Sequence, residues 1–381
     1  MIRRTMTRAR IAILAVPVFF LMSALAYGQL DKMIIPAGTP EDKDLTAITN
    51  EPDAQKRIAM YQDFVQKYAT NPVAAAYGNW QLSQSYQVAG DLPKATDYGD
   101  KAAAGAPHSL EVLEWDVTLA QQAKDNPRTL KYSIQGGQAY ASIDKQPKPA
   151  DVSDADFAHS IASEKETNQE AYSFFETSAY NVIVAEPDAK TKMDDIDQFT
   201  AAFPNSKLQE QVASMAMLAL SELKDKPRLN EYAEKALAAN PNNLAALLSL
   251  ANSYLDSAEP AKAVPYAQRA VVAAKADDPT ADHARKVSAG LAHSILGRVY
   301  AKQLKTPASI AELKLAVALL RGQDDQQFAV AGYYLGYEYA KVPQLTEARA
   351  ILTEVAGISG PAQGPARELL AKVNAARAAG H

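Results

Sequence analysis

The sequence predicts an all-α fold, a solenoid of antiparallel helix hairpins stacked into a superhelix. Ala is abundant and Gly is sparse in the long central segments, and Ala is the strongest helix former. Apolar or small residues recur at helical spacing, for example at Leu247, Leu250, Ala251 and Tyr254. A second stripe follows a short turn, from Ala263 to Ala270. Since neither helix could bury its stripe alone, neighbouring pairs must stack on one another.

Residues 1–28 are predicted to be a signal peptide. The segment opens with a positive region that holds no acid, formed by Arg3, Arg4, Arg8 and Arg10. An apolar stretch follows, and small residues precede Gln29. A retained membrane anchor is the alternative, because the apolar run is near the lower limit for crossing a bilayer. Pro17 favours cleavage, so we expect an exported bacterial protein, periplasmic or secreted, that meets a membrane only if this leader is retained.

Composition excludes several classes of chemistry. The chain has no Cys, which removes disulfides, thiol nucleophiles and Cys-ligated metal sites. Its net charge is −5, and it becomes −9 without the four arginines of the leader. An acidic protein of this kind is not expected to have nucleic acid as its main partner.

After the leader, the sequence divides at changes in composition. Residues 29–50 form a polar lead-in that we expect to be extended or poorly ordered, and residues 51–143 form a first block of helical repeats. A linker is predicted at 144–153, where Pro147 and Pro149 occur, before a second block at 154–364. Residues 365–381 have the pattern of a capping helix. One continuous superhelix and two blocks hinged at the linker both remain open.

Five segments repeat the same pattern, and the second and third of them are 34 residues apart. Each carries apolar or small residues at equivalent positions of two successive helices: Leu82, Tyr86, Ala95, Ala102; Ala216, Leu220, Leu229, Ala236; Leu250, Tyr254, Ala263, Ala270; Leu296, Tyr300, Leu313, Ala316; Leu335, Tyr339, Ala348, Leu352. A longer echo links the stretch that begins at Glu51 to the one that begins at Glu186. The two halves therefore share a plan of one leading helix followed by a repeat.

This spacing resembles the tetratricopeptide repeat (TPR) family, in which units of about 34 residues carry Leu-Gly, Tyr and Ala at fixed positions. Leu-Gly is present in two of the five units, at Leu296-Gly297 and Leu335-Gly336. The Trp of the family pattern is missing from its usual place, and Trp80 lies one position after it. Residues 109–185 are helical in pattern but match the family poorly. The resemblance covers about half of the chain.

No motif for catalysis, metal binding or cofactor binding was found. The sequence contains no phosphate-binding Gly loop, no H-E-x-x-H and no G-x-S-x-G. We interpret His293 as a packed or rim histidine, and Asp194, Asp195 and Asp197 as a solvated first turn. We therefore expect no catalytic, cofactor or metal site. An enzyme with its site in the divergent region 109–185 is kept as an alternative.

The resemblance implies a binding function, because the first helix of each TPR unit lines a concave groove that takes a peptide or a partner segment. Transferring the groove positions gives these candidate residues: Trp80, Asn252, Arg298, Lys302, Tyr333, Tyr337 and Lys341. We expect the cations to attract an acidic or carboxylate-ended segment and the tyrosines to stack against it. The predicted function is a non-catalytic protein–protein interaction scaffold. A membrane-anchored accessory factor of an envelope assembly or secretion complex is the runner-up.

Overall fold

The computed structural model describes residues 30–257 and 259–379. This part of the chain contains eighteen α-helices, two short 3-10 helices and no strand. The first helices are α1 (Pro40–Thr49), α2 (Ala54–Lys67), α3 (Pro72–Val88), α4 (Leu92–Gly105), α5 (Leu110–Ala123), α6 (Asn126–Ser142) and η1 (Ile143–Lys145). The middle of the chain forms α7 (Asp154–Thr167), α8 (Gln169–Ala185), α9 (Ala189–Ala202), α10 (Gln209–Glu222) and α11 (Lys226–Ala239). The remaining helices are α12 (Leu244–Leu255), η2 (Pro260–Lys262), α13 (Ala263–Ala274), α14 (His283–Lys302), α15 (Thr306–Leu320), α16 (Asp325–Lys341), α17 (Leu345–Gly357) and α18 (Gln363–Ala379).

Most hairpins are closed by the same turn. In four of them a residue with a positive φ follows the end of the first helix by one or two positions: Gly90, Lys124, Lys224 and Leu304. The next backbone N–H donates to the carbonyl five residues back at 2.9 Å in each case, from Asp91 to Tyr86, Asp125 to Ala120, Asp225 to Leu220 and Lys305 to Tyr300. This 6→1 bond satisfies a helix-end carbonyl and reverses the chain within a few residues.

The same turns also start the second helix of each hairpin. The side chains of Asp91, Asp125 and Asp225 each accept a hydrogen bond from a backbone N–H three residues later. Such N-caps satisfy helix-end donors that would otherwise lack partners. A proline then follows in the first turn of all three helices, where its missing N–H costs nothing. Local sequence therefore sets both ends of the turn.

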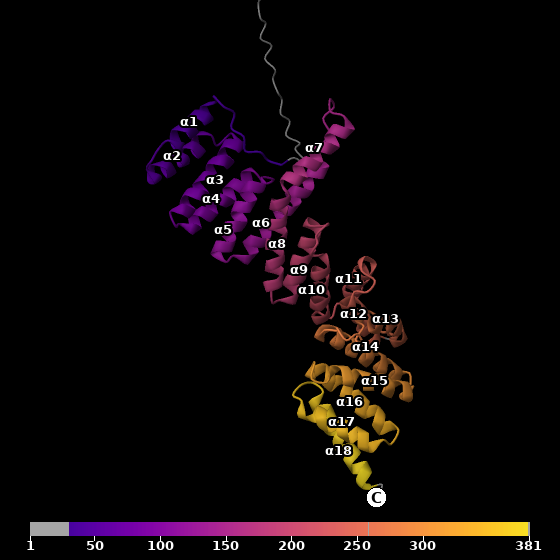
Figure 1. The fold of residues 1–381 in the computed structure, drawn as a ribbon. Coiled ribbons are helices and arrows are strands. Elements are labelled where there is room, and N and C mark those ends of the chain that lie inside the picture. The colour runs from indigo at the N-terminus through magenta and orange to yellow at the C-terminus, as the bar shows by residue number, and fades with distance from the viewer. Residues whose placement is uncertain (1–29, 258, 380–381) are drawn as a thin grey trace, which may run out of the picture.

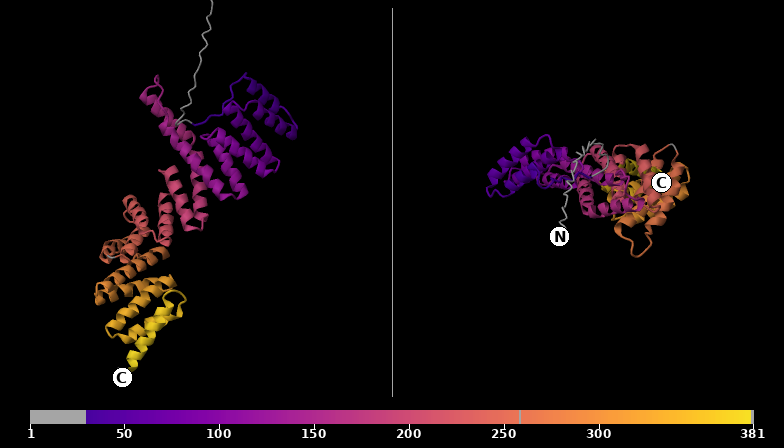
Figure 2. Two further views of the ribbon diagram at one scale, coloured as in Figure 1. Left: turned by 180° about the vertical axis from the view of Figure 1, so that it is seen from behind. Right: turned by 90° about the horizontal axis from the view of Figure 1, so that it is seen from above.

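Consecutive helices pack side by side along the chain and form one bent row (Figure 1). The first helices of successive hairpins also contact one another. Helix α12 contacts both α10 and α14, and α14 also contacts α16. Among the described residues the second helices α11, α13, α15 and α17 make no comparable contact with each other. The first helices therefore form the crowded inner wall of the curve. Figure 2 shows the same row from behind and from above.

Equivalent residues of different units have equivalent surroundings, which confirms the predicted repeat. Tyr86 stacks on Tyr98 with ring centroids 5.4 Å apart, and Tyr254 stacks on Tyr266 at 5.7 Å. The two Leu-Gly glycines are alike as well, because a Cβ at either one would meet a leucine of the second helix. The closest approaches would be 2.5 Å between Gly297 and Leu313 and 2.6 Å between Gly336 and Leu352.

The echo between the two halves corresponds to a matching pair of helices. At the start of α2 the Glu51 carboxylate accepts a hydrogen bond from the Asp53 N–H at 2.8 Å. At the start of α9 the Glu186 carboxylate accepts one from the Asp188 N–H at the same distance. Phe64 and Phe199, at equivalent positions, are both buried. The sequence echo therefore reflects two copies of one capped helix.

Three features differ from the sequence-based expectations. The lead-in, expected to be extended as far as residue 50, forms helix α1 from Pro40. The divergent region contains a further hairpin, α5 with α6, whose turn at Lys124 lies 34 residues after Gly90. The predicted linker leads into α7, which has no buried residue and projects from the row (Figure 1).

The core continues across the predicted linker at 144–153. Helix α6 packs directly on α8 and α9, so α7 is bypassed. One cluster of buried residues joins Leu113 of α5, Tyr132 of α6, Phe175 of α8 and Phe199 of α9. Two apolar surfaces that are packed in this way do not separate at the linker.

The predicted signal peptide lies outside the described residues. Within the described ranges, none of the helices combines the length and the apolar character needed to cross a bilayer.

Candidate functional site

The predicted groove residues all lie on first helices of hairpins. Helix α3 carries Trp80, α12 carries Asn252, α14 carries Arg298 and Lys302, and α16 carries Tyr333, Tyr337 and Lys341. The structure brings Asn252 and Arg298 into one pocket and places the other predicted residues outside it.

Asn252 and Arg298 line a pocket of about 580 Å³ on the inner wall. We call it the inner-wall pocket; it lies among α10, α12 and α14. Its lining carries three cations, Lys224, Lys226 and Arg298, and a single carboxylate, Asp256. Four serines and Gln327 add hydroxyl and amide groups to the same lining. The pocket is therefore positive within an acidic protein, and it can both donate and accept hydrogen bonds.

Arg298 is the best-positioned cation of the inner-wall pocket. Its guanidinium lies 3.8 Å from the Asp256 carboxylate and 5.0 Å from the centre of the Tyr334 ring. The side chain is 21% exposed, so the group is partly desolvated and still reachable. Stacking on an aromatic ring restrains a guanidinium without using its N–H donors. The ring that stacks on Arg298 belongs to Tyr334, which was not among the predicted groove residues.

Lys302 has a local partner. Its ammonium donates to the Leu255 carbonyl at 2.5 Å, at the C-terminal end of α12. Cations are stabilised at helix C-termini, where unpaired carbonyls carry partial negative charge. In this position Lys302 ties α14 to α12.

Tyr337 and Lys341 form a second group on α16. The Lys341 ammonium lies 4.7 Å from the centre of the Tyr337 ring and 2.6 Å from the carboxylate of the fully buried Glu338. Tyr337 is 43% exposed, so its ring offers contact area at the surface. Tyr333 packs edge-on against Tyr334, with ring centroids 5.4 Å apart.

Trp80 lies in the first part of the chain, far along the row from α12. It packs edge-on against Tyr77 with a centroid separation of 6.2 Å. Its indole N–H is buried without a hydrogen-bond partner among the described residues. The structure therefore does not place it with the other predicted residues.

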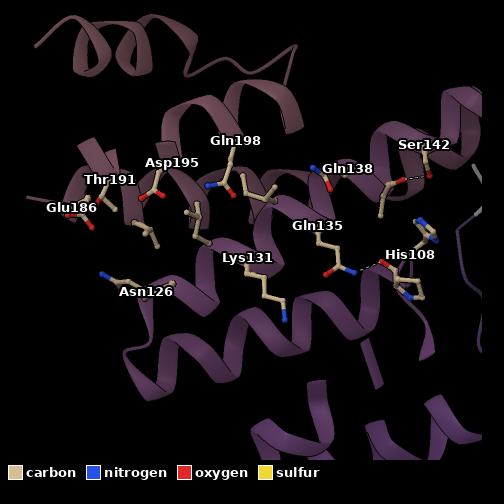
Figure 3. Close-up of a pocket in the computed structure, with 16 residues that line it drawn as sticks. His108, Asn126, Lys131, Gln135, Gln138, Ser142, Glu186, Thr191, Asp195 and Gln198 are labelled. Carbon is tan, nitrogen blue, oxygen red and sulfur yellow. Dashed lines mark hydrogen bonds between the residues drawn. The ribbon is translucent and has the colours of Figure 1, made fainter. Parts of the chain in front are cut away.

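A second and larger pocket, of about 740 Å³, lies between α6 and α9 (Figure 3). We call it the α6–α9 pocket. Glu186, Thr191 and Asp195 gather at one end of it, and His108 and Ser142 lie at the other. Amides of Asn126, Gln135, Gln138 and Gln198 line the space between them. Both α6 and α9 are second helices, so this pocket is distinct from the inner wall.

Asp195 is the unusual group of the α6–α9 pocket. It is 8% exposed, and no described residue forms a hydrogen bond or an ion pair with its carboxylate. Burial, together with the carboxylates of Glu186 and Asp194, raises the pKa of the Asp195 carboxyl to about 6. The interpretation of Asp194, Asp195 and Asp197 as a solvated first turn is wrong, because α9 begins at Ala189 and Asp195 is buried.

The sequence held one signal for the burial of Asp195. Phe199 and Ala202, four and seven residues later, are both buried, which places Asp195 on the same side of α9. Asp197, by contrast, is exposed and binds Arg228 at 2.7 Å. The three acids carry the same charge, but their positions around the helix differ. Asp195 lies on the buried side of α9, and Asp194 and Asp197 lie on the exposed side.

His293 packs against α15, as expected for a rim histidine. Its Nδ1 lies 2.6 Å from a Glu312 carboxylate oxygen, and both side chains are mostly buried. The part of the chain that the structure describes has no group of three or more His, Asp or Glu side chains arranged to hold a metal ion.

Comparisons with known proteins gave only structural similarity. No protein-family model matches the chain, and no curated protein is similar to it in sequence. Among solved structures it is similar to the TPR domain of P58(IPK), with 11% identity over 88% of this chain and 98% of that one and a TM-score of 0.34. It is also similar to a monomeric IFIT1 mutant solved with m7Gppp-AAAA (13% identity, 89% of this chain, 73% of that one, TM-score 0.33) and to a chain of the APC/C hetero-tetramer Cut9-Hcn1 (11%, 89%, 90%, 0.28).

These TM-scores are low, so the description of the fold rests on the helices and turns of this chain itself. Helix order, repeated turns and equivalent packing of the repeat residues make it an all-α, TPR-like helical-repeat superhelix.

Proposed function

We propose that this protein is a non-catalytic interaction scaffold that binds an extended, carboxylate-bearing segment of a partner protein in the inner-wall pocket. The observation that carries the proposal is the charge of that pocket, whose lining holds three cations, Lys224, Lys226 and Arg298, and one carboxylate, Asp256. Carboxylates attract guanidinium and ammonium groups strongly when the site is partly desolvated.

The remaining groups of the pocket suit a peptide backbone. The Asn252 side chain is exposed on the inner wall, and an amide can donate to a peptide carbonyl while it accepts from a peptide N–H. Serine hydroxyls in the same lining add further donors and acceptors. A segment lying along α12 would contact Asn252 and Arg298 together, and it would reach Tyr337 if it continued to α16.

The enzyme alternative would be located at the α6–α9 pocket, which is lined partly by the divergent region and holds a carboxyl with a raised pKa. Two acids at one end of the pocket and amide groups beside them offer acceptors and donors for holding a cationic group. We assign the pocket a binding role, developed below.

We also propose that the protein is exported through its N-terminal leader and meets its partner in the periplasm or outside the cell. Positive residues followed by an apolar run support this proposal. Sequencing the N-terminus of the protein recovered from an envelope fraction tests it. An N-terminus near Gln29 is expected, whereas an intact leader would favour the membrane-anchored accessory factor.

Charge reversal tests the inner-wall pocket. A short fluorescein-labelled peptide rich in Asp, with a free C-terminal carboxylate, should bind the protein and lose about tenfold in affinity with Arg298→Glu. Lys314→Glu is the matched control, because Lys314 is exposed on α15 and lines none of the described pockets. Fluorescence anisotropy at two salt concentrations measures both effects, and binding should weaken at high salt.

Arg298→Glu places a new acid beside Asp256 and could impair folding for that reason. The neutral variant Arg298→Gln removes the positive charge without adding a negative one. It should also bind the peptide more weakly while its thermal unfolding stays near that of the original protein. Equal binding by Arg298→Gln, Arg298→Glu and Lys314→Glu would exclude the inner-wall pocket as the carboxylate site.

A further inference from the structure

The α6–α9 pocket contains a mostly buried carboxylate that the described part of the protein does not pair. Asp195 is 8% exposed, lines the cavity, and receives no hydrogen bond or ion pair from the described residues. An ionised carboxylate that is withdrawn from water and left unpaired is costly. A positively charged ligand would remove this cost on binding.

We propose that the α6–α9 pocket binds an alkylammonium group, held between Asp195 and Glu186. Figure 3 shows these two acids at the same end of the cavity. The Glu186 carboxylate is fixed in place, because one of its oxygens accepts the Asp188 N–H at 2.8 Å. Two carboxylates from the end of α8 and from α9 can share the three N–H donors of an ammonium group.

The cations already present near the pocket have other partners. Lys131 lies over the Tyr132 ring at 4.5 Å, and its ammonium is 3.3 Å from the Tyr132 hydroxyl. His108, at the opposite end, lies 3.5 Å from a carboxylate oxygen of Asp31. Neither is paired with Asp195, so the acidic end is available to a ligand.

The rest of the lining fits an alkyl chain with polar groups attached. Leu130, Ile134, Ala139 and Val182 provide an apolar surface for a methylene stem. The amides of Gln138 and Gln198 can pair with amide groups of the ligand. The volume of about 740 Å³ exceeds that of a simple amine and accommodates a lysine side chain with its neighbouring peptide units.

Both a lysine side chain and a free polyamine carry this chemistry. The test uses the full chain and three probes: the blocked peptide Gly-Lys-Gly, the same peptide with norleucine in place of lysine, and 1,5-diaminopentane. Isothermal titration should show that the lysine peptide binds at least about tenfold more tightly than the norleucine peptide. A lysine peptide that binds more tightly than the diamine identifies a protein segment as the ligand, and the reverse order identifies a free amine.

Asp195→Asn and Asp194→Asn form a matched pair of variants. Each removes one negative charge from neighbouring positions of α9, but Asp194 is exposed and Asp195 is buried. Asp195→Asn should lower the affinity for the lysine peptide at least about tenfold, whereas Asp194→Asn should change it less than about twofold. Glu186→Gln keeps an oxygen for the Asp188 N–H and should weaken binding to an intermediate extent, which keeps the test valid if Asp195→Asn does not fold.

The proposal is overturned if none of the cationic probes binds, if the norleucine peptide binds as well as the lysine peptide, or if Asp194→Asn and Asp195→Asn lose affinity equally. Arg298→Glu should leave binding of the lysine peptide unchanged. The outcome is therefore independent of the inner-wall pocket.

Discussion

Single buried carboxyls show most clearly how the environment sets chemistry in this protein. Asp116 on α5 is 2% exposed, and one of its oxygens has no hydrogen-bond partner among the described residues. Burial, and next the negative charge of Asp100, raise the pKa of the Asp116 carboxyl to about 8. Asp116 is therefore largely protonated at neutral pH.

This raised pKa predicts a stability that falls with rising pH. The folded state holds the Asp116 proton up to about pH 8, whereas the unfolded chain releases it near the ordinary value of 3.8. Between these values the folded state binds more protons, so the free energy of unfolding decreases as pH rises, by at most about 1.4 kcal/mol per pH unit. Asp195 contributes in the same direction only up to about pH 6.

Thermal unfolding of the protein and of Asp116→Asn between pH 6 and pH 9 measures the effect of this one group. The original protein should lose stability up to about pH 8, and the variant should show a flatter profile. Parallel profiles would mean that Asp116 is already ionised in the folded protein.

Within a hairpin, close contact between its two helices depends on glycine at the Leu-Gly position. A Cβ on Gly336 of α16 would lie 2.6 Å from the Leu352 side chain of α17, which is fully buried and cannot move away freely. Gly364 near the start of α18 has no neighbour within 4 Å of such a Cβ. The same substitution should therefore have opposite effects at the two positions.

Gly336→Ala is expected to lower the free energy of unfolding by about 1–3 kcal/mol, as overpacking does in close-packed cores. Gly364→Ala should leave it unchanged or raise it by up to about 1 kcal/mol, because alanine restricts the unfolded chain and favours the helix. Urea unfolding compares the two variants. A stable Gly336→Ala would show that the two helices are less tightly packed than the structure indicates.

At the scale of the whole molecule, each helix is stabilised mainly by its neighbours in the row, so stability can differ from one part of the row to another. Separate clusters of buried residues hold α1–α4 and α14–α18, and contacts join each helix chiefly to its neighbours. In such an array a defect weakens its own unit and the adjacent interfaces more than distant ones. We therefore do not expect the two ends to unfold together.

Leu352→Ala and Leu82→Ala test this prediction as a pair, because both leucines are fully buried in the clusters at opposite ends of the row. Each should cost about 2–5 kcal/mol locally. Amide hydrogen exchange should show lost protection in α16–α18 for the first variant and in α2–α4 for the second. Equal loss of protection at both ends for either variant would indicate one cooperative unit.

The binding sites were predictable only in part. Helical spacing and the family resemblance placed Asn252 and Arg298 on adjacent first helices, and the structure brings them into one pocket. Lys302 followed the same spacing, but the end of α12 lies beside it and takes its ammonium. The α6–α9 pocket was missed, since its lining comes from helices that are distant in sequence.

The amino-acid sequence by itself determined the helices, their caps and their turns, because these depend on residues within a few positions of each other. Three helices begin with the same N-cap, in which an Asp side chain accepts a backbone N–H: Asp91, Asp125 and Asp225. The turn at Lys124 was not predicted, because a lysine occupies the position where Gly90 lies in the first hairpin, although Asp125 and Pro127 follow it as usual. Only the tertiary structure decided that α6 bypasses α7 to reach α8 and α9, and that Asp195 lines a cavity between α6 and α9. Such contacts depend on packing between helices that are distant in sequence, and the local sequence does not specify which of these helices will pack together.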